Sequence, residues 1–329
     1  MSLLRMGIAG TGGMGGNHAR ILSARPDVEL VALFDTDPVA MNRLEKSLGM
    51  AVHGLNHYAS LESMIEEEKL DAIVIATPHT CHADQVRVSL KSGLHVLVEK
   101  PMATTTKDAR DFIAYSEKAN KVLSIAYQRH GDGKFIKARE LIKADAIGDV
   151  RLIHVIIAQD CLRIFTPGAS WRADPQLSGG GHFMDTGSHI NDILLWTTGL
   201  EPETVHAFIN SEGTLVDVNT AISVKFTNGA VGNLSYTSMS PEWREEFTFY
   251  GTKGVMRFGA SESLLLNQKG KDIVLPLTPS KGQSPADNFV EAIHGREEVQ
   301  APAICGLRVV QLTEAAYKSG ESGNPEKVG

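Results

Sequence analysis

The feature that most constrains the fold is a regular alternation of short apolar runs and amphipathic stretches over the first 128 residues. The runs RMGIAG, VELVALFD, DAIVIATP, HVLVEK and VLSIAYQ are rich in β-branched residues and favour strands. Helical patterns lie between them, through NHARILSA and near residues 38–48, 81–92 and 104–119. Strands that are apolar throughout are typical of a parallel sheet covered by helices on both faces. Residues 1–127 are therefore predicted to form a doubly wound α/β domain.

The pattern changes after residue 127. A helical stretch near 133–144 leads into the long run DVRLIHVIIAQD, and later segments alternate apolar and polar residues as half-buried strands do. Asn228-Gly229, between two such segments, is a strong hairpin signal, and another turn is expected around Gly251–Gly254. The helical patterns PADNFVEAIHG and GLRVVQLTEAAYKSG follow. Residues 128–329 are therefore predicted to form an α+β domain with a largely antiparallel, open sheet.

A glycine-rich turn joins the first predicted strand to the first predicted helix. Gly10, Gly12 and Gly15 have the spacing GxGxxG, in which successive glycines permit a tight turn, the approach of a pyrophosphate and close packing of helix on strand. The strand before and the helix after favour a dinucleotide site over an ordinary glycine-rich turn. The residues expected around the phosphates are Gly10, Thr11, Gly12, Gly13, Met14 and Gly15.

Asp35 ends the second predicted strand, where a carboxylate can accept hydrogen bonds from the ribose hydroxyls of adenosine. Thr36, the next residue, belongs to the predicted cofactor site, and Asp37 follows with a second carboxylate. Two carboxylates repel a 2′-phosphate, so this pattern favours NAD over NADP. A purely structural alternative is that Asp35 caps the loop and that Asp37, directly before Pro38, begins the next helix.

Composition narrows the classes of function. The 329-residue chain has a formal net charge of −7 and no arginine-rich stripe, so nucleic acid is not expected as a partner. No apolar run is long enough to span a bilayer and no secretory signal is evident, so no membrane partner is expected and a cytoplasmic location is favoured. Cys81, Cys161 and Cys305 are far apart and form no CxxC pair, so neither a disulfide framework nor a thiolate zinc site is indicated.

Residues 178–199, SGGGHFMDTGSHINDILLWTTG, join a glycine-rich loop to an apolar helix that carries Asp185 and His189 one turn apart. Three consecutive glycines let a backbone approach a ligand closely, which favours a binding site. His182, Asp185 and His189 also have a spacing that suits a divalent metal. A pair of satisfied core residues is the third reading. The segment alone leaves all three open.

Four segments in order, GTGGMG, IATPHTCH, VEKPMA and WRADPQLSGGGHFMDTGSHINDILLW, resemble the Gfo/Idh/MocA family of sugar and polyol oxidoreductases, and the chain looks inositol dehydrogenase-like. The resemblance covers nearly the whole chain. It implies a Rossmann domain, then a substrate-binding domain whose open sheet commonly makes an oligomer interface, and so a homodimer or homotetramer. It also implies hydride transfer without a metal.

The resemblance assigns site residues as well. In the family, the lysine of the EKP motif, here Lys100, contacts both cofactor and substrate. The other cofactor contacts that it implies are Thr77, Pro78, His82, Glu99 and Gln128. The substrate contacts that it implies are Arg129, Trp171 and Arg172, of which the last two suit a packing element equally well.

The implied reaction is oxidation of an alcohol by NAD. The hydroxyl must lose its proton as its carbon gains carbonyl character, and an imidazole suits this step because its pKa lies near neutrality. His189 is the expected base, Lys100 is expected to stabilise charge on the reacting oxygen, and Asp185 to orient His189 or a substrate hydroxyl. The alternatives are a non-catalytic dinucleotide-binding sensor and an NAD-dependent glycosidase of the same fold.

Overall fold

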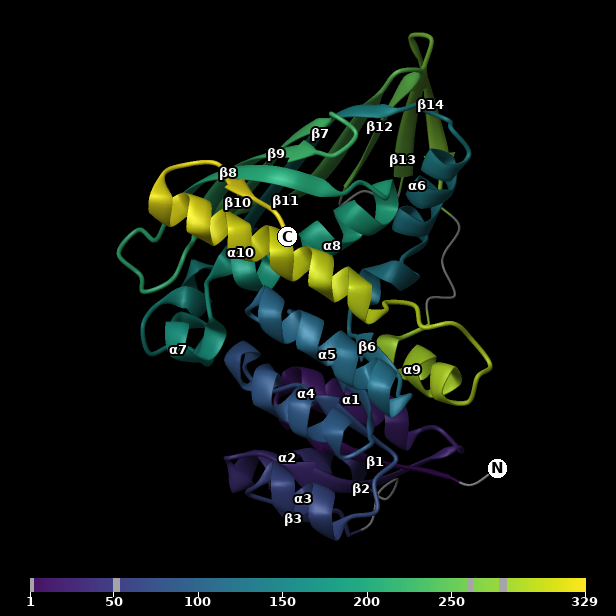
Figure 1. Ribbon diagram of the computed structural model, residues 1–329, viewed down its shortest axis with the longest axis vertical. Helices are drawn as coiled ribbons and strands as arrows, with labels where there is room; N and C mark the ends of the chain where they lie inside the picture. The colour runs from purple at the N-terminus through teal and green to yellow at the C-terminus, as the bar shows by residue number, and fades with distance from the viewer. Residues whose placement is uncertain (1–2, 50–53, 260–262, 278–282) are drawn as a thin grey trace. The chain divides into compact units, whose positions relative to one another are not determined.

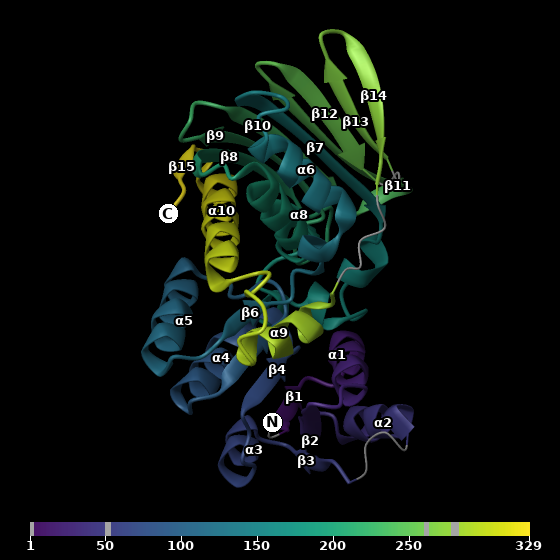
Figure 2. The same ribbon diagram turned by 90° about the vertical axis from the view of Figure 1, so that its right-hand side faces the viewer.

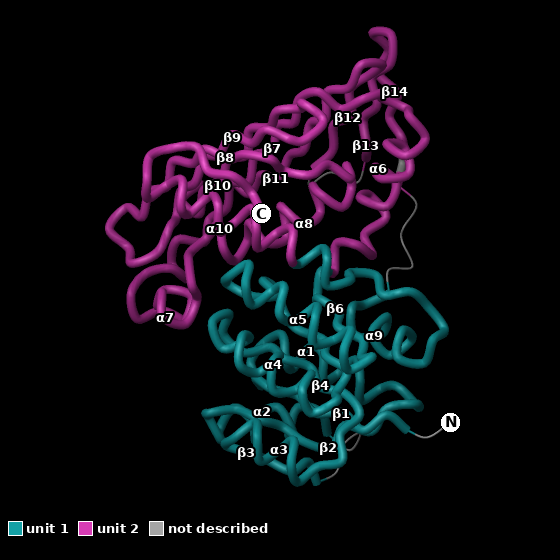
Figure 3. The backbone as a smooth tube through the Cα atoms, in the orientation of Figure 1, with its two compact units in different colours: residues 1–127, 283–306 teal, residues 128–282, 307–329 magenta. Residues whose placement is uncertain are grey.

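The computed structural model describes residues 3–49, 54–259, 263–277 and 283–329, and the chain divides into two compact units (Figure 3). Unit 1 contains residues 1–127 and 283–306, and unit 2 contains residues 128–282 and 307–329. The sequence placed residues 283–306 in the second domain, and this assignment was wrong. An amphipathic pattern shows that one face of a helix is buried, but it does not show which core buries it.

Unit 1 is built on six parallel strands in the order β3-β2-β1-β4-β5-β6. The strands are β1 (Leu4–Ala9), β2 (Val28–Phe34), β3 (Asn56–Tyr58), β4 (Ala72–Ile75), β5 (His95–Val98) and β6 (Leu123–Ile125). Every residue of β4 is buried, as expected for a central parallel strand covered on both faces. The order reverses between β1 and β4, and doubly wound sheets bind their ligands beyond the carboxyl ends of the strands at this position. The predicted doubly wound sheet is confirmed.

Helices cover both faces of this sheet (Figure 2). One layer contains α1 (Gly13–Ser23), α2 (Pro38–Leu48) and α9 (Pro285–Ile293), and the other contains α3 (Leu61–Glu67), α4 (His82–Lys91) and α5 (Thr106–Ala119). Phe289 and Val290 of α9 are fully buried in the same core as Ile8 and Val74, which explains why α9 belongs to unit 1.

Unit 2 contains a nine-stranded sheet in the order β14-β13-β12-β11-β7-β10-β9-β8-β15. The strands are β7 (Val150–Asp160), β8 (Pro202–Asn210), β9 (Asn219–Phe226), β10 (Val231–Thr237), β11 (Met239–Gly251), β12 (Gly254–Gly259), β13 (Ser263–Gln268), β14 (Lys271–Pro276) and β15 (Glu326–Lys327). β7 and β10 are parallel, whereas the other neighbouring strands are antiparallel. The hairpins expected at Asn228-Gly229 and Gly251–Gly254 join β9 to β10 and β11 to β12.

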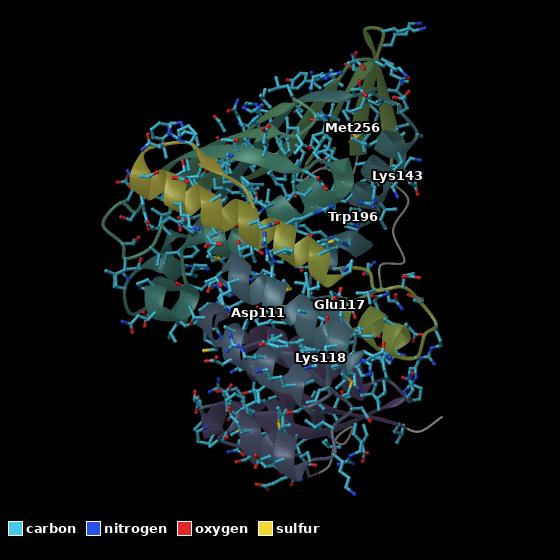
Figure 4. All side chains as sticks on the ribbon, viewed as in Figure 1. Asp111, Glu117, Lys118, Lys143, Trp196 and Met256 are labelled. Carbon is cyan, nitrogen blue, oxygen red and sulfur yellow. The ribbon has the colours of Figure 1, made fainter. Side chains whose placement is uncertain are left out.

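One face of this sheet is covered by α6 (Gly133–Lys143), α8 (His182–Thr198) and α10 (Ala303–Ser322), as Figure 1 shows. The short helix α7 (Pro175–Ser178) precedes α8. Met256 of β12 and Trp196 of α8, both labelled in Figure 4, contribute to the core between the sheet and its helices. In the described parts of the chain, no helix combines the length and the apolar character that a bilayer-spanning segment needs.

Candidate functional site

The glycine-rich turn of unit 1 has the shape that a bound phosphate group requires. Gly10 has a φ of +87°, and a Cβ there would lie 2.6 Å from the backbone of Ala76. A Cβ on Gly15 would lie 1.8 Å from the carbonyl oxygen of Gly10, so helix and strand pack at a distance that only glycine allows. At Gly12 and Gly13, by contrast, a Cβ would meet no atom within 4 Å.

The N-terminus of α1 is open in the same place. Its N-cap is Gly12, which supplies no side-chain hydrogen bond, and its first turn carries no acidic residue. The first backbone N–H groups of a helix need an acceptor, and the helix dipole favours a negative charge there. The open space over Gly12 and Gly13 and the uncapped helix together fit the pyrophosphate of a dinucleotide.

Asp35 holds this turn in place. Its Oδ2 accepts hydrogen bonds from the backbone N–H and the hydroxyl of Thr11, at 2.7 and 2.8 Å, and its Oδ1 accepts one from the N–H of Asp37, at 3.0 Å. A carboxylate has about four acceptor positions. Asp35 therefore keeps capacity for a ribose hydroxyl beside its structural role. Asp37 caps α2 through the N–H of Val39, as the structural alternative predicted.

Glu99 and Lys100 lie just beyond the carboxyl end of β5, and both are buried. Oε1 of Glu99 lies 2.8 Å from Nε2 of His18 on α1. Burial by itself raises the pKa of the Glu99 carboxyl, but the hydrogen bond and charge of His18 and the charge of Lys100 bring this pKa below its ordinary value. The carboxyl end of β5 is therefore followed by a buried carboxylate and an adjacent lysine.

Thr77, just after β4, donates a hydrogen bond from its hydroxyl to Gln85.

His82 has a different role from the predicted cofactor contact. Its ring is fully buried, and its two nitrogens lie 2.9 and 3.0 Å from the carbonyl oxygens of Pro101 and Thr77. Burial, and next the neighbouring His79, lower the pKa of His82 to about 4, so the ring is neutral near pH 7. A neutral ring has one N–H, so His82 donates to only one of these two carbonyl oxygens. Because the ring is fully buried between the loops that follow β4 and β5, this structure supports a packing role for His82 rather than the predicted cofactor contact.

In unit 2 the three glycines of residues 179–181 are explained by packing. Gly179 has a φ of +70° and ends α7. A Cβ on Gly180 would lie 2.3 Å from the hydroxyl oxygen of Tyr317, and a Cβ on Gly181 would lie 1.9 Å from the carbonyl oxygen of Asp217. The expectation that these glycines serve the approach of a ligand is therefore replaced by a close contact within the unit.

Asp217 packs against Gly181 so closely that its backbone occupies the space of a Cβ. Its carboxylate accepts hydrogen bonds from the N–H groups of Gly181 and Phe183, both at 2.7 Å, and from the Tyr317 hydroxyl at 2.5 Å. These bonds satisfy N–H groups at the start of α8 as an N-cap side chain would. Asp217 thereby fixes the first turn of the helix that carries Asp185 and His189.

Asp185, in that first turn, is anchored by Arg172. Nε of Arg172 donates to Oδ2 of Asp185 at 2.8 Å, and the guanidinium lies over the Trp171 ring, 4.4 Å from its centroid. Arg172 and Trp171 thus hold a candidate catalytic carboxylate, which is a third role beside the two that the sequence suggested. His189 follows one turn later and is partly exposed.

His182 is bonded to a residue of β7. Its ring is fully buried, its Nε2 lies 2.9 Å from Oε1 of Gln159, and burial lowers its pKa to about 4. Within the described residues, His182, Asp185 and His189 do not bring three ligand atoms close enough together to hold one metal ion. This geometry argues against the metal reading of the segment.

Gln128 and Arg129 begin unit 2 in a short 3₁₀ turn. Gln128 is exposed, whereas both terminal nitrogens of Arg129 bond to Glu245, at 2.7 and 2.8 Å. This bidentate pair is strong and specific in geometry. It commits Arg129 to β11, which weakens the case for a substrate contact by this side chain.

Sequence reasoning missed His18, Gln159, Asp217 and Glu245. His18 had a local signal, because it follows the glycine motif on the same helix. The other three act through residues 23, 36 and 116 positions away, and no short motif indicates such partners.

The fold and the glycine turn define a dinucleotide-binding protein of the doubly wound class, and the comparisons identify the family as one of oxidoreductases. Residues 4–127 match the NAD-binding Rossmann fold of the oxidoreductase family, and residues 135–257 match the GFO/IDH/MocA C-terminal domain. The chain belongs to the Gfo/Idh/MocA family.

Individual relatives are distant. The rhizopine catabolism protein MocA of Rhizobium meliloti is 33% identical over 202 residues, which cover 61% of this chain and 59% of that protein, less than two thirds of its length. Myo-inositol 2-dehydrogenase of Thermotoga maritima is 26% identical over 262 residues, covering 76% and 74%. The structure of levoglucosan dehydrogenase with NADH and levoglucosan has a TM-score of 0.86 at 21% identity, covering 99% of this chain and 100% of that one. At this identity the likeness shows the fold alone.

Proposed function

We propose that the protein is an NAD-dependent dehydrogenase that oxidises a hydroxyl group of a polyol, a sugar or a related small molecule. The observation that carries the proposal is the uncapped, open N-terminus of α1 above Gly12, together with Lys100 at the end of β5 in the same unit. The relative named myo-inositol 2-dehydrogenase supports the substrate class.

We assign the cofactor to unit 1. The turn from Gly10 to Gly15 would hold the pyrophosphate, and Asp35 and Thr36 the adenosine ribose. Thr77, Pro78, Glu99 and Lys100 would lie toward the nicotinamide, and Gln128 is proposed as a further contact. Because Asp35 can accept from ribose hydroxyls and Asp37 adds a second negative charge, NAD is proposed over NADP.

The bound cofactor supplies a hydride acceptor, and the side chains handle the proton and the charge. His189 takes the proton of the substrate hydroxyl. Lys100 donates a hydrogen bond to the same oxygen and stabilises negative charge as it develops. Asp185, held by Arg172, orients His189 or a neighbouring substrate hydroxyl.

A spectrophotometric screen of polyols and aldoses with NAD and NADP in parallel tests this proposal. We expect NADH to accumulate with at least one polyol or aldose, and more slowly or not at all with NADP. Tight NADH binding without turnover of any compound would instead support a sensor. Cleavage of a glycoside without net NADH would support the glycosidase alternative.

We also propose that the protein is a homodimer or homotetramer that associates through the sheet face of unit 2 opposite its helices. Phe208 and Val231, on β8 and β10, are 72% and 49% exposed. Val231 lies opposite Leu152 of β7, which is 37% exposed, and adjoining exposed apolar side chains favour association. Light scattering on the purified protein measures the mass directly, and a monomer at micromolar concentration contradicts the proposal.

A further inference from the structure

His18, which has no role in the chemistry proposed above, forms a buried pair with Glu99 in unit 1. His18 lies on α1 and Glu99 directly follows β5, and the distance from Nε2 to Oε1 is 2.8 Å. Their side chains are only 2% and 8% exposed. A carboxylate at this depth requires a partner, because an unpaired buried charge is costly.

The Glu99 carboxylate makes two connections. Oε1 is bonded to the His18 ring, and Oε2 accepts a hydrogen bond from the backbone N–H of Lys100 at 3.3 Å. Since the pKa of Glu99 lies below its ordinary value, the group is ionised near pH 7 and accepts both bonds at once. The same carboxylate therefore contacts a helix and the backbone of the lysine.

These bonds connect two parts of the proposed cofactor site that are far apart in the sequence. His18 lies five residues after Gly13, the first residue of α1, so it belongs to the helix whose N-terminus faces the open glycine turn. Lys100 is the second residue after β5, next to Glu99. Glu99 bonds to α1 through His18 and to the backbone of Lys100, so it fixes the position of Lys100 relative to the phosphate-binding turn.

We propose that His18 is a positioning residue that couples the phosphate-binding end of α1 to Lys100 through Glu99. The proposal rests on the dinucleotide site and the role of Lys100 assigned above. The simpler reading is a core ion pair that contributes only to folding. The two readings differ in cofactor binding, because only a positioning pair makes the effects of His18 and Lys100 depend on each other.

A double-mutant cycle distinguishes a positioning pair from a purely structural ion pair. It measures NADH affinity by NADH fluorescence. The proteins are wild type, His18→Leu, Lys100→Met and the double variant. Leucine fills the space without a donor, whereas His18→Gln keeps an amide donor. We expect His18→Leu to weaken NADH binding about tenfold and His18→Gln to stay within about threefold of wild type. The effects of His18→Leu and Lys100→Met should depart from additivity by at least about threefold.

His95→Leu is the matched control. His95 begins β5, at the opposite end from Glu99, and its Nδ1 accepts from the N–H of Val122 at 3.0 Å. We expect this variant to keep wild-type NADH affinity and to combine additively with Lys100→Met. If His18→Leu does not fold, His18→Met, which also lacks an N–H donor, takes its place with the same expectations.

Additive effects of His18→Leu and Lys100→Met in folded proteins overturn the proposal. So does an equal loss of affinity in His18→Leu and His18→Gln. Because the readout is NADH binding, the cycle decides the role of His18 even if the wild-type protein oxidises no polyol. NADH binding without oxidation of any polyol or sugar would contradict the proposed function, but not the role of His18.

Discussion

At the scale of single residues, Asp35 has a structural role beside the cofactor contact that we propose for it. Three hydrogen bonds to Thr11 and Asp37 hold the glycine turn, and an acceptor position remains for a ribose hydroxyl. The sequence predicted the position of Asp35 from its place after a strand. It did not predict the bonds to Thr11, because these depend on how the turn folds back.

Asp35→Ser should therefore weaken NAD binding and narrow the preference for NAD over NADP. A hydrogen bond to a charged group contributes about 1.5 to 3 kcal/mol, which corresponds to a loss of about tenfold to a hundredfold in affinity. Parallel titrations with both cofactors measure the effect. Asp37→Asn is the control, since asparagine also caps helices well and should leave NAD affinity nearly unchanged. Tighter binding of NADP than NAD by the wild-type protein contradicts the assignment.

At the scale of elements, the placement of α8 depends on its N-terminal packing against Asp217. A Cβ added at Gly181 meets the Asp217 backbone, so Gly181→Ala should destabilise the protein by about 3 kcal/mol, the upper range for overpacking. Gly199, at the other end of α8, has open space and a φ of +70°. Gly199→Ala should cost only about 1 kcal/mol, for its left-handed backbone. Denaturant unfolding compares the two, and equal losses would show that the Asp217 contact is unimportant.

Individual elements of both units show what a sequence can and cannot predict. Apolar periodicity was sufficient for the parallel strands of unit 1, and Asn228-Gly229 for one hairpin of unit 2. The short β3 and α3 went unnoticed because three and seven residues carry little periodicity. The candidate residues Asp185 and His189 were found from a motif. Their supports, Arg172 and Asp217, were not assigned these roles, because the roles arise only when distant segments meet.

At the scale of the whole molecule, a network of charges joins the early part of the chain to its late part within unit 1. Arg25 bonds to Asp27, Asp287 and Glu291, and Arg296 bonds to Asp27 and Glu291. The hydrogen bonds of Arg25 to Asp27, and of Arg296 to Glu291, are the main causes that lower the pKa values of these two carboxyls. This network fastens α9 to the Rossmann sheet.

Acid should weaken this network. A carboxyl whose pKa is lower in the folded state stabilises the fold above its unfolded pKa, near 4, and loses this contribution as pH falls toward the folded value. Asp27→Asn should therefore lower the free energy of unfolding at pH 7 by about 1 to 2 kcal/mol and flatten its decline below about pH 4. Urea unfolding at several pH values measures both effects.

Asp111→Asn is the control for this experiment. Asp111, labelled in Figure 4, lies on α5 and pairs with the exposed Lys107. Pairs at the surface contribute little to stability, so its unfolding profile should match that of wild type at every pH. Parallel pH profiles of Asp27→Asn and wild type would show that the network does not govern acid stability.

The central claim is that this member of the Gfo/Idh/MocA family oxidises alcohols with His189 as base and Lys100 as stabiliser of the reacting oxygen. The most direct test is the rate of NADH formation by His189→Asn and Lys100→Met on the best compound of the screen, measured with melting temperature and NAD affinity. We predict folded proteins whose turnover falls by about 10² to 10⁴, with NAD affinity retained in His189→Asn. Near wild-type turnover of a folded His189→Asn protein would contradict the account.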